Sequence, residues 1–272
     1  MPTEKILITG KAAPHWSRKK RELTICCGGI TENFEQRRLY PIPIKDIDKI
    51  RNFSWVEAKV TKQHLRDHRP ESRKLLRHLP DYLKVISRVS SHGARKYYLE
   101  KCVRPCVEVM KEKRETLGIV KPVIKSMEVT EVEFKPPEEL DDEQTTLAIW
   151  ANVPSISGQI AYEKWSKAYA VKNFEVRARF TCGEQCQLKE HNMKVLDIEF
   201  FRLYQNVYRR YRDKEIAFEK MREKIASEEK RNDIYFALGT HNRYPFVSFM
   251  VGSTIRIRKG TKAIPPIASF FT

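Results

Sequence analysis

An acidic stretch divides the chain into two basic parts, and this division limits what the chain can fold into. Residues 126–143 carry eight acidic side chains and one basic one. Residues 1–125 carry 29 basic and 14 acidic side chains, and residues 144–272 carry 22 and 13. Each basic part is long enough to bury a core of its own. The pattern predicts two domains, 1–125 and 144–272, joined by an acidic linker at 126–143.

The first part predicts a small β-barrel. Short runs with many β-branched and aromatic residues lie at 5–9, 23–27, 37–42 and 55–61. We interpret the Gly28-Gly29 pair and the PIP sequence at 41–43 as turns. Short strands at this spacing suit a barrel of the OB or SH3-like type. We expect helices appended to this barrel at 70–79, 81–90 and 97–117.

The second part predicts an α+β domain. Residues 174–181 alternate apolar and polar side chains in the manner of a half-buried strand. Residues 194–231 have apolar side chains at helical spacing, and Asp213 is a point at which this long helix can divide in two. Two further strands are expected at 233–238 and 246–257, joined by a polar loop. The predicted fold class of the whole chain is therefore α+β.

The sign of the charge indicates a polyanionic partner. Lys and Arg number 52 against 35 Asp and Glu, which gives a net charge of +17. Basic residues that neutralise phosphates gain free energy by releasing counterions, so this excess favours nucleic acid. The surface of a thermophilic protein is also rich in charge, but that explains the number of charged residues and not the excess of one sign. Electrostatic steering of another acidic partner is the main alternative.

Four groups of side chains are candidates for contact with nucleic acid. Arginine binds phosphate while a tyrosine ring stacks on an exposed base, and basic residues alternate with tyrosines at 95–98 and 204–212. The loop between the last two strands presents polar side chains from a rigid base. In the alternative, the tyrosines pack on the core and the arginines form a solvated face. The candidates are Arg18, Lys19, Lys20 and Arg21; Arg95 and Lys96; Arg209, Arg210 and Arg212; and His241, Asn242 and Arg243.

A cysteine–histidine motif predicts a metal site. Cys182, Cys186 and His191 have the spacing C-x3-C-x4-H between a predicted strand and a predicted helix. Thiolates and imidazoles are the ligands that Zn²⁺ prefers, and these three converge if the chain turns at Gly183. A structural zinc ion would need a fourth, remote ligand. The candidates for it are Cys102, Cys106 and His241. Disulfide bonds and free structural thiols are the alternatives.

The same region offers groups for catalysis. His191, Asp197 and Glu199 provide an imidazole and two carboxylates, which suffice to bind Mg²⁺ and to orient a water for phosphodiester hydrolysis. Positions two apart do not share a face of a helix, so this hypothesis needs an extended chain at 197–199. In the alternative, Asp197 caps the following helix. A metal-dependent nuclease or nucleotide hydrolase is therefore the competing function.

The order of the motifs resembles an uncharacterised family of small prokaryotic proteins. The resemblance rests on C-x3-C-x4-H-x-M-x3-D-x-E from Cys182 to Glu199, and on RLYPIP at 38–43, DHRPES at 67–72 and GTHNRYP at 239–245. It implies that these positions form one site. The first part is also similar to OB-type domains associated with nucleotide modification and phage conflict. That similarity implies a role in DNA repair or in antiviral defence.

Two absences restrict the cellular setting. No run approaches the roughly 18 apolar residues of a membrane span, and the residues after Met1 lack the pattern of a signal peptide. We therefore expect a cytoplasmic protein without a membrane partner. The favoured function is nucleic-acid binding, of DNA more than of RNA. A subunit of a larger assembly, with a protein partner or a second copy of the chain, is a further alternative.

Overall fold

The chain folds into two β-sheets that pack against each other and against helices. The computed structural model describes residues 2–17, 22–61, 67–132, 174–183, 186 and 190–266. The first sheet contains β1 (Thr3–Lys11), β2 (His15–Ser17), β3 (Glu22–Thr31), β4 (Gln36–Pro43), β5 (Ser54–Thr61), β6 (Ser72–Leu75) and β7 (Leu83–Arg88). The second contains β8 (Val103–Arg104), β9 (Leu117–Val120), β10 (Val123–Glu131), β11 (Phe174–Thr181), β12 (His191–Val195), β13 (Asn232–Thr240) and β14 (Phe249–Arg258). The helices are α1 (His92–Cys102), α2 (Val107–Glu112), α5 (Ile198–Tyr211) and α6 (Lys214–Arg231), with a short 3-10 helix at Ile44–Asp46.

Five strands of the first sheet close into a barrel. β1 pairs with β3, β3 with β4, β4 with β6 and β6 with β5, and β5 returns to pair with β1. The β4–β6 pair is parallel, whereas the other pairs are antiparallel. Alternate side chains fill the interior, so that Ile6 and Ile8 point inward while Leu7 packs outside. The predicted β-barrel is confirmed, and its topology is OB-like.

The Gly28-Gly29 pair lies inside β3 and not in a turn. A Cβ at Gly29 would lie 2.5 Å from Ile6 Cγ2 and 2.6 Å from the Leu7 carbonyl oxygen. Only glycine therefore allows β1 and β3 to approach each other here. Residues 41–43 likewise continue β4. The two predicted turns are wrong, because the glycines serve close packing between strands and the prolines are accommodated within β4.

Two of the helices expected after the barrel are strands. The region 70–79 contains β6, which closes the barrel between β4 and β5, and the region 81–90 contains β7, which pairs with β5. Pairing with neighbouring strands overrides the local helical pattern in both. The region 97–117 is only partly helical: α1 ends at Cys102, and β8 and Pro105 separate it from α2. The appended helix α1 is confirmed, with Ser91 as its N-cap.

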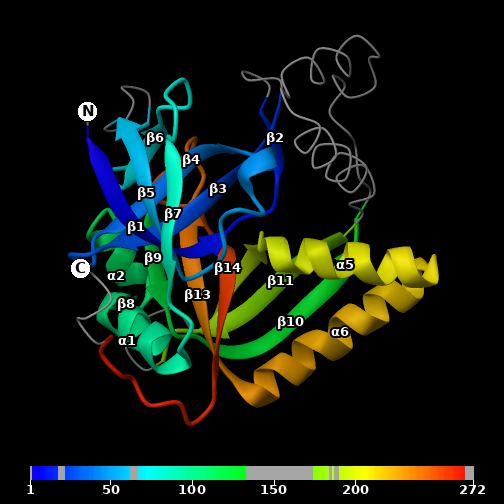
Figure 1. Ribbon diagram of the computed structural model, residues 1–272. Coiled ribbons are helices and arrows are strands. Elements are labelled where there is room, and N and C mark those ends of the chain that lie inside the picture. Colours follow the sequence, from blue (N-terminus) through cyan, green and yellow to red (C-terminus); the bar gives the residue numbers. More distant parts are fainter. Residues whose placement is uncertain are drawn as a thin grey trace.

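The second sheet has the order β10-β11-β12-β14-β13-β9-β8. In Figure 1, α5 and α6 lie together beside β10 and β11, away from the barrel. Strand β13 shows how the sheet separates two layers. Phe236 packs with side chains of α5 and α6, whereas its neighbour Tyr235 packs with α1 and the outside of the barrel. The predicted α+β fold is confirmed.

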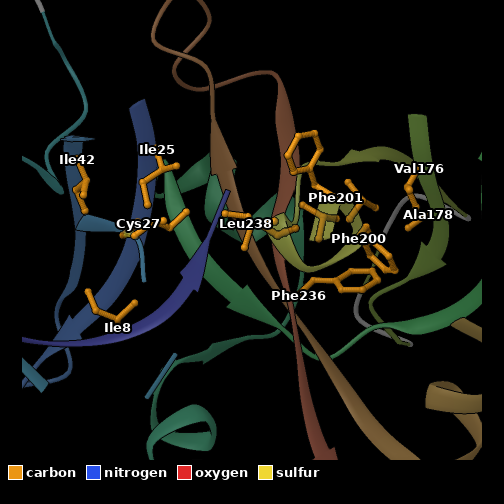
Figure 2. Close-up of a cluster of buried hydrophobic side chains, with 14 of the residues drawn as sticks. Ile8, Ile25, Cys27, Ile42, Val176, Ala178, Phe200, Phe201, Phe236 and Leu238 are labelled. Atoms are coloured by element: carbon orange, nitrogen blue, oxygen red, sulfur yellow. The ribbon is translucent and has the colours of Figure 1, made fainter. Parts of the chain in front are cut away.

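The outer surface of β1, β3 and β4 is covered by the second sheet. Leu7 and Ile30 pack with Ile119 and Tyr235, and a Cβ on Gly28 would lie 3.7 Å from Leu117 Cδ1 of β9. The two sheets therefore share buried apolar surface. Figure 2 shows part of the other, larger cluster, with barrel residues on one side and residues of the second sheet and α5 on the other: Ile8, Ile25, Cys27 and Ile42, and Val176, Ala178, Phe200, Phe201, Phe236 and Leu238.

The change from the first sheet to the second comes earlier than the charge pattern predicts. β8 and β9 lie before residue 126 but pair in the second sheet, which thus begins at Val103. The expected linker at 126–143 begins inside β10, and its residues 133–143 lie outside the described residues. Charge reports which side chains face solvent, whereas the sheet to which a strand belongs depends on buried apolar residues.

The long helical stretch divides in two as predicted. Asp197 is the N-cap of α5 and accepts a hydrogen bond of 2.9 Å from the Glu199 N–H. Asp213 is the N-cap of α6 and accepts one of 2.9 Å from the Ile216 N–H. Arg212, between the helices, has a left-handed backbone with φ of 55°. The chain can therefore turn between α5 and α6, which pack side by side.

Candidate functional site

The cysteine–histidine motif lies where β11 and β12 meet. The two strands are antiparallel, and Phe180 of β11 is paired with His191 of β12. Cys182 follows β11 directly, and the backbone turns at Gly183, which has φ of 90°. The Cys186 N–H donates to the Gly183 carbonyl at 3.2 Å. The predicted turn at this glycine thus brings the second thiol back toward the histidine.

The three side chains converge. The two thiol sulfurs and one imidazole nitrogen all lie within 4.8 Å of one another, and Cys186 Sγ is 3.1 Å from His191 Nε2. His191 is buried against the ring of Phe180, with 5.1 Å between the ring centroids. Burial raises the pKa of the Cys182 thiol to about 12, so that in the absence of a cation this thiol is neutral. The cluster could hold a metal ion.

Glu108 of α2 also reaches this cluster, although the sequence did not suggest it. Its Oε2 atom accepts a hydrogen bond from the Cys186 thiol at 3.2 Å and lies 3.7 Å from His191 Nε2. The only sequence signal was its position two residues after Cys106.

Two of the three candidates for a remote ligand, Cys102 and His241, have other surroundings, whereas the Cys106 side chain lies beside the Glu108 carboxylate. Cys102 is buried in the layer between α1 and the barrel, and its thiol donates to the Phe34 carbonyl at 3.9 Å. Cys106 is the buried N-cap residue of α2, and His241 lies on the β13–β14 loop, where its Nδ1 accepts from the Arg243 N–H at 3.2 Å. All six cysteines lie in the described ranges, and no two of them form a disulfide bond.

Three connections meet at one end of the barrel, and we call this region the three-loop rim. It consists of residues 12–17 of the β1–β3 connection, residues 67–71 of the β5–β6 connection and the β13–β14 loop (241–248). Arg69 Nη1 donates to the Thr240 carbonyl at 2.9 Å, which fixes the second connection against the start of the third. In Figure 1 the loop between β13 and β14 reaches the barrel beside β4. Residues 18–21 and 62–66 lie outside the described residues.

A buried network of opposite charges holds the rim together. Arg38 donates to the Thr116 hydroxyl at 3.1 Å and to its carbonyl at 2.6 Å, while Glu71 accepts from the Thr116 N–H at 2.9 Å. Arg69 binds both carboxylate oxygens of Asp67, at 2.7 and 2.9 Å. Burial alone would raise the pKa of Asp67, but Arg69 outweighs it and the pKa is lowered. Because two guanidinium groups face two carboxylates, this network positions loops and offers no excess charge to a ligand.

Uncharged and basic side chains lie above this network. The His15 ring stacks on Tyr40 with 5.4 Å between centroids, and its Nε2 is 3.0 Å from the Tyr40 hydroxyl. Desolvation and the nearby imidazole of His241 both lower the pKa of His15. The β13–β14 loop exposes His241, Asn242, Arg243 and Tyr244. The structure thus brings the RLYPIP, DHRPES and GTHNRYP motifs together, but not with the cysteine cluster.

The other predicted contact residues differ in their exposure. Arg95 donates to the Val89 carbonyl at 2.8 Å and lies over the Phe53 ring, and Lys96 donates to the Thr261 carbonyl at 2.8 Å. These two side chains hold the fold together and are not presented to a ligand. The basic residues Arg18, Lys19, Lys20 and Arg21 lie outside the described part of the chain.

The end of α5 keeps its basic side chains exposed. Arg209, Arg210 and Arg212 all face solvent. The tyrosines among them follow the alternative interpretation: Tyr204 is buried, and Tyr208 stacks on it at 5.8 Å. Only Tyr211, with 43% of its surface exposed, remains for contact with a ligand.

The predicted catalytic groups do not converge. His191 begins β12, whereas Asp197 follows its other end, so about 20 Å of extended chain separates them. Asp197 is buried, and its Oδ2 accepts from the Thr254 N–H at 2.7 Å and from the Thr254 hydroxyl at 2.5 Å. Burial raises the pKa of Asp197. Its role in this geometry is to cap α5 and to join it to β14.

The fold and its clusters define an α+β protein with an OB-like barrel and a Cys₂His cluster able to hold a metal ion. Residues 107–271 match the family model described as Domain of unknown function (DUF8757), which is more than half of the chain, and the chain belongs to this family. Residues 2–101 match Domain of unknown function (DUF8758). The two matched regions adjoin near Val103, where the second sheet begins.

No curated protein matches the chain. No helix in the described ranges is long and apolar enough to cross a membrane.

Proposed function

We propose that the protein binds nucleic acid, with DNA as the expected ligand, at the three-loop rim. The observation that carries the proposal is the Arg69–Thr240 hydrogen bond of 2.9 Å, because it joins a barrel connection to the loop of the second sheet. In OB-type barrels the loops after the first and the fourth barrel strand bind oligonucleotides. The corresponding connections here follow β1 and β5, and their described parts, 12–17 and 67–71, belong to the rim.

The packing of the barrel favours the rim over the strand surface. OB-type barrels also use the outer face of their second and third strands, which are β3 and β4 in this chain. That face is covered by the second sheet: a Cβ on Gly28 would lie 3.7 Å from Leu117 Cδ1, and a Cβ on Gly239 would lie 3.3 Å from Arg38 Nη2. The loops at the barrel end are therefore the better surface for a ligand.

The chemistry of the rim suits a single-stranded or splayed nucleic acid. Tyr244 has 54% of its surface exposed and offers a ring for base stacking, and Arg243 beside it offers a guanidinium group for phosphate. His241 and Asn242 add groups that can donate and accept hydrogen bonds. The net charge of +17 supplies long-range attraction for a polyanion.

A titration tests this proposal. Labelled single-stranded DNA, duplex DNA and RNA of equal length are titrated with the protein at several salt concentrations. We expect micromolar or tighter binding at low salt, and an affinity that falls by about 0.7–0.9 log units per log unit of salt for each neutralised phosphate. Polyglutamate is the control for charge alone. The proposal is wrong if none of the three nucleic acids binds more tightly than polyglutamate.

We also propose that the ion of the Cys₂His cluster is zinc and that its role is structural. Two thiolates and an imidazole are soft or borderline ligands that suit Zn²⁺ better than Mg²⁺ or Ca²⁺. The ion would fix the connection between β11 and β12, since metal binding contributes directly to folding free energy. We expect about one zinc per purified chain, and a lower zinc content and melting temperature for Cys182→Ser. Absence of zinc in the wild type would contradict the proposal.

A further inference from the structure

We propose that Glu108 is the fourth ligand of the metal ion, through its Oε2 atom, and that the ion thereby joins α2 to the β11–β12 hairpin. The inference rests on the proposed zinc site and extends it by one residue and one element. The sequence distance from Glu108 to the motif is large, and the fold alone brings them together.

Three of the six edges of a tetrahedral site have suitable lengths. With metal–ligand bonds of about 2.0–2.3 Å, the ligand atoms of a tetrahedral zinc site lie roughly 3.4–3.8 Å from one another. Glu108 Oε2 lies 3.2 Å from Cys186 Sγ and 3.7 Å from His191 Nε2. The third edge, from Cys186 Sγ to His191 Nε2, is 3.1 Å. Shifts of a few tenths of an ångström would therefore let these three atoms face one ion, and the Cys182 thiol lies within 4.8 Å of the Cys186 and His191 ligand atoms.

The surroundings of Glu108 independently favour the binding of a cation. Its other oxygen, Oε1, is buried and has no hydrogen-bond partner among the described residues. The Glu108 side chain has only 14% of its surface exposed, and that of His191 only 3%. A carboxylate in such a place loses hydration that the neighbouring thiol replaces only in part. A divalent cation compensates this loss: when it binds, the two thiols release their protons, and two thiolates and one carboxylate then face its positive charge.

The position of Glu108 gives the ion a larger structural role. Along the chain, α2 connects β8 to β9, and these two strands stand at the opposite end of the sheet order from β10 and β11. A site made only of the motif residues would fix one connection. A site that includes Glu108 also fixes α2, whose residues Val107 and Met110 are buried in the main core. The ion therefore ties distant segments of the second sheet to each other.

The test compares Glu108→Gln with Glu112→Gln, an exposed glutamate one turn further along the same helix. Zinc affinity is measured by competition with a chromophoric chelator. Loss even of an outer hydrogen-bond partner weakens metal binding by about 10–100-fold, so we expect at least a tenfold loss for Glu108→Gln and none for Glu112→Gln. In Co²⁺-substituted protein, the visible spectrum should change for Glu108→Gln and become sensitive to added azide, since a water would replace the carboxylate.

Stability of the metal-free forms separates the role of the ligand from a folding defect. With zinc removed, Glu108→Gln should melt at or above the wild-type temperature, and only its gain on adding zinc should shrink. If the wild type binds zinc and Glu108→Gln binds it equally well, Glu108 is not a ligand, but the zinc proposal stands. If the wild type binds no zinc, both proposals are wrong.

Discussion

Three of the buried charged side chains in the described residues, Arg38, Arg69 and Glu71, lie at the three-loop rim, where each has a counter-charge. Arg38 and Arg69 are 2% and 8% exposed, and Glu71 and Asp67 face them through Thr116 or directly. A buried ion pair adds little net stability, but removal of one partner leaves an unpaired charge at considerable cost. The network therefore specifies the arrangement of the loops more than it stabilises the fold.

Asp67→Asn tests this conclusion. The substitution removes one charge from a largely buried pair with Arg69, and we expect a loss of about 2 kcal/mol in the free energy of unfolding at pH 7. The pKa of Asp67 is lowered in the folded state, so its contribution is present above the ordinary value of 3.8 and is lost as the pH falls through the folded pKa. The difference between mutant and wild type, measured by urea unfolding, should therefore shrink below about pH 4.

Asp48→Asn is the matched control for this measurement. Asp48 pairs with Arg202 at 2.8 Å, but 58% of its side chain is exposed. An exposed pair contributes less than about 1 kcal/mol, so this variant should differ little from the wild type at either pH. Equal losses for the two variants would contradict the assigned role of the buried network.

The sequence predicted side chains whose chemistry depends on spacing and missed those that only the fold brings together. Cys182, Cys186 and His191 lie within one connection, so a turn at Gly183 was enough to predict their convergence. Glu108 comes from a different element, and no spacing rule relates it to the motif. Arg95 was predicted to contact nucleic acid, because a sequence does not show that Val89 and Phe53 engage it.

At the scale of elements, local signals succeeded where the chain interacts mainly with itself. Asp213 divides the long helix as expected, because a capping side chain acts on the N–H groups of its own helix. The alternation at 174–181 matches the bounds of β11, Phe174–Thr181. β6 was missed because its partners, β4 and β5, determine its conformation. Gly29 was misassigned for a similar reason, since its contact lies on another strand.

At the scale of the whole molecule, the exposed candidates for contact with nucleic acid occupy two separate places. The three-loop rim lies at the end of the barrel, whereas Arg209, Arg210 and Arg212 lie at the far end of α5. Asp197, at the start of that helix, bridges to Ala12 next to β1. From there α5 extends about 21 Å, and Figure 1 shows it running away from the barrel. The two surfaces are therefore expected to affect binding in different ways.

Two triple variants distinguish these surfaces. Replacement of Arg209, Arg210 and Arg212 by alanine removes three charges, so it should flatten the log–log salt slope by up to about 2–3 and weaken binding evenly across sequences. Replacement of His241, Arg243 and Tyr244 by alanine removes one permanent charge and an exposed ring. It should flatten the slope by no more than about 1, yet lower the affinity for single strands by about 1–3 kcal/mol through lost stacking.

Fluorescence anisotropy with single-stranded and duplex DNA at several salt concentrations gives both quantities for each variant. The rim is the binding surface if its variant loses more affinity for single strands than for duplex at a nearly unchanged slope. An unchanged slope in the folded arginine variant would instead assign the end of α5 to a solvated face, since phosphate contacts there would have to release counterions. If the rim variant binds single strands as tightly as the wild type, the three loops do not carry the interaction, and convergence of the three motifs at the barrel end serves only to hold the two sheets together.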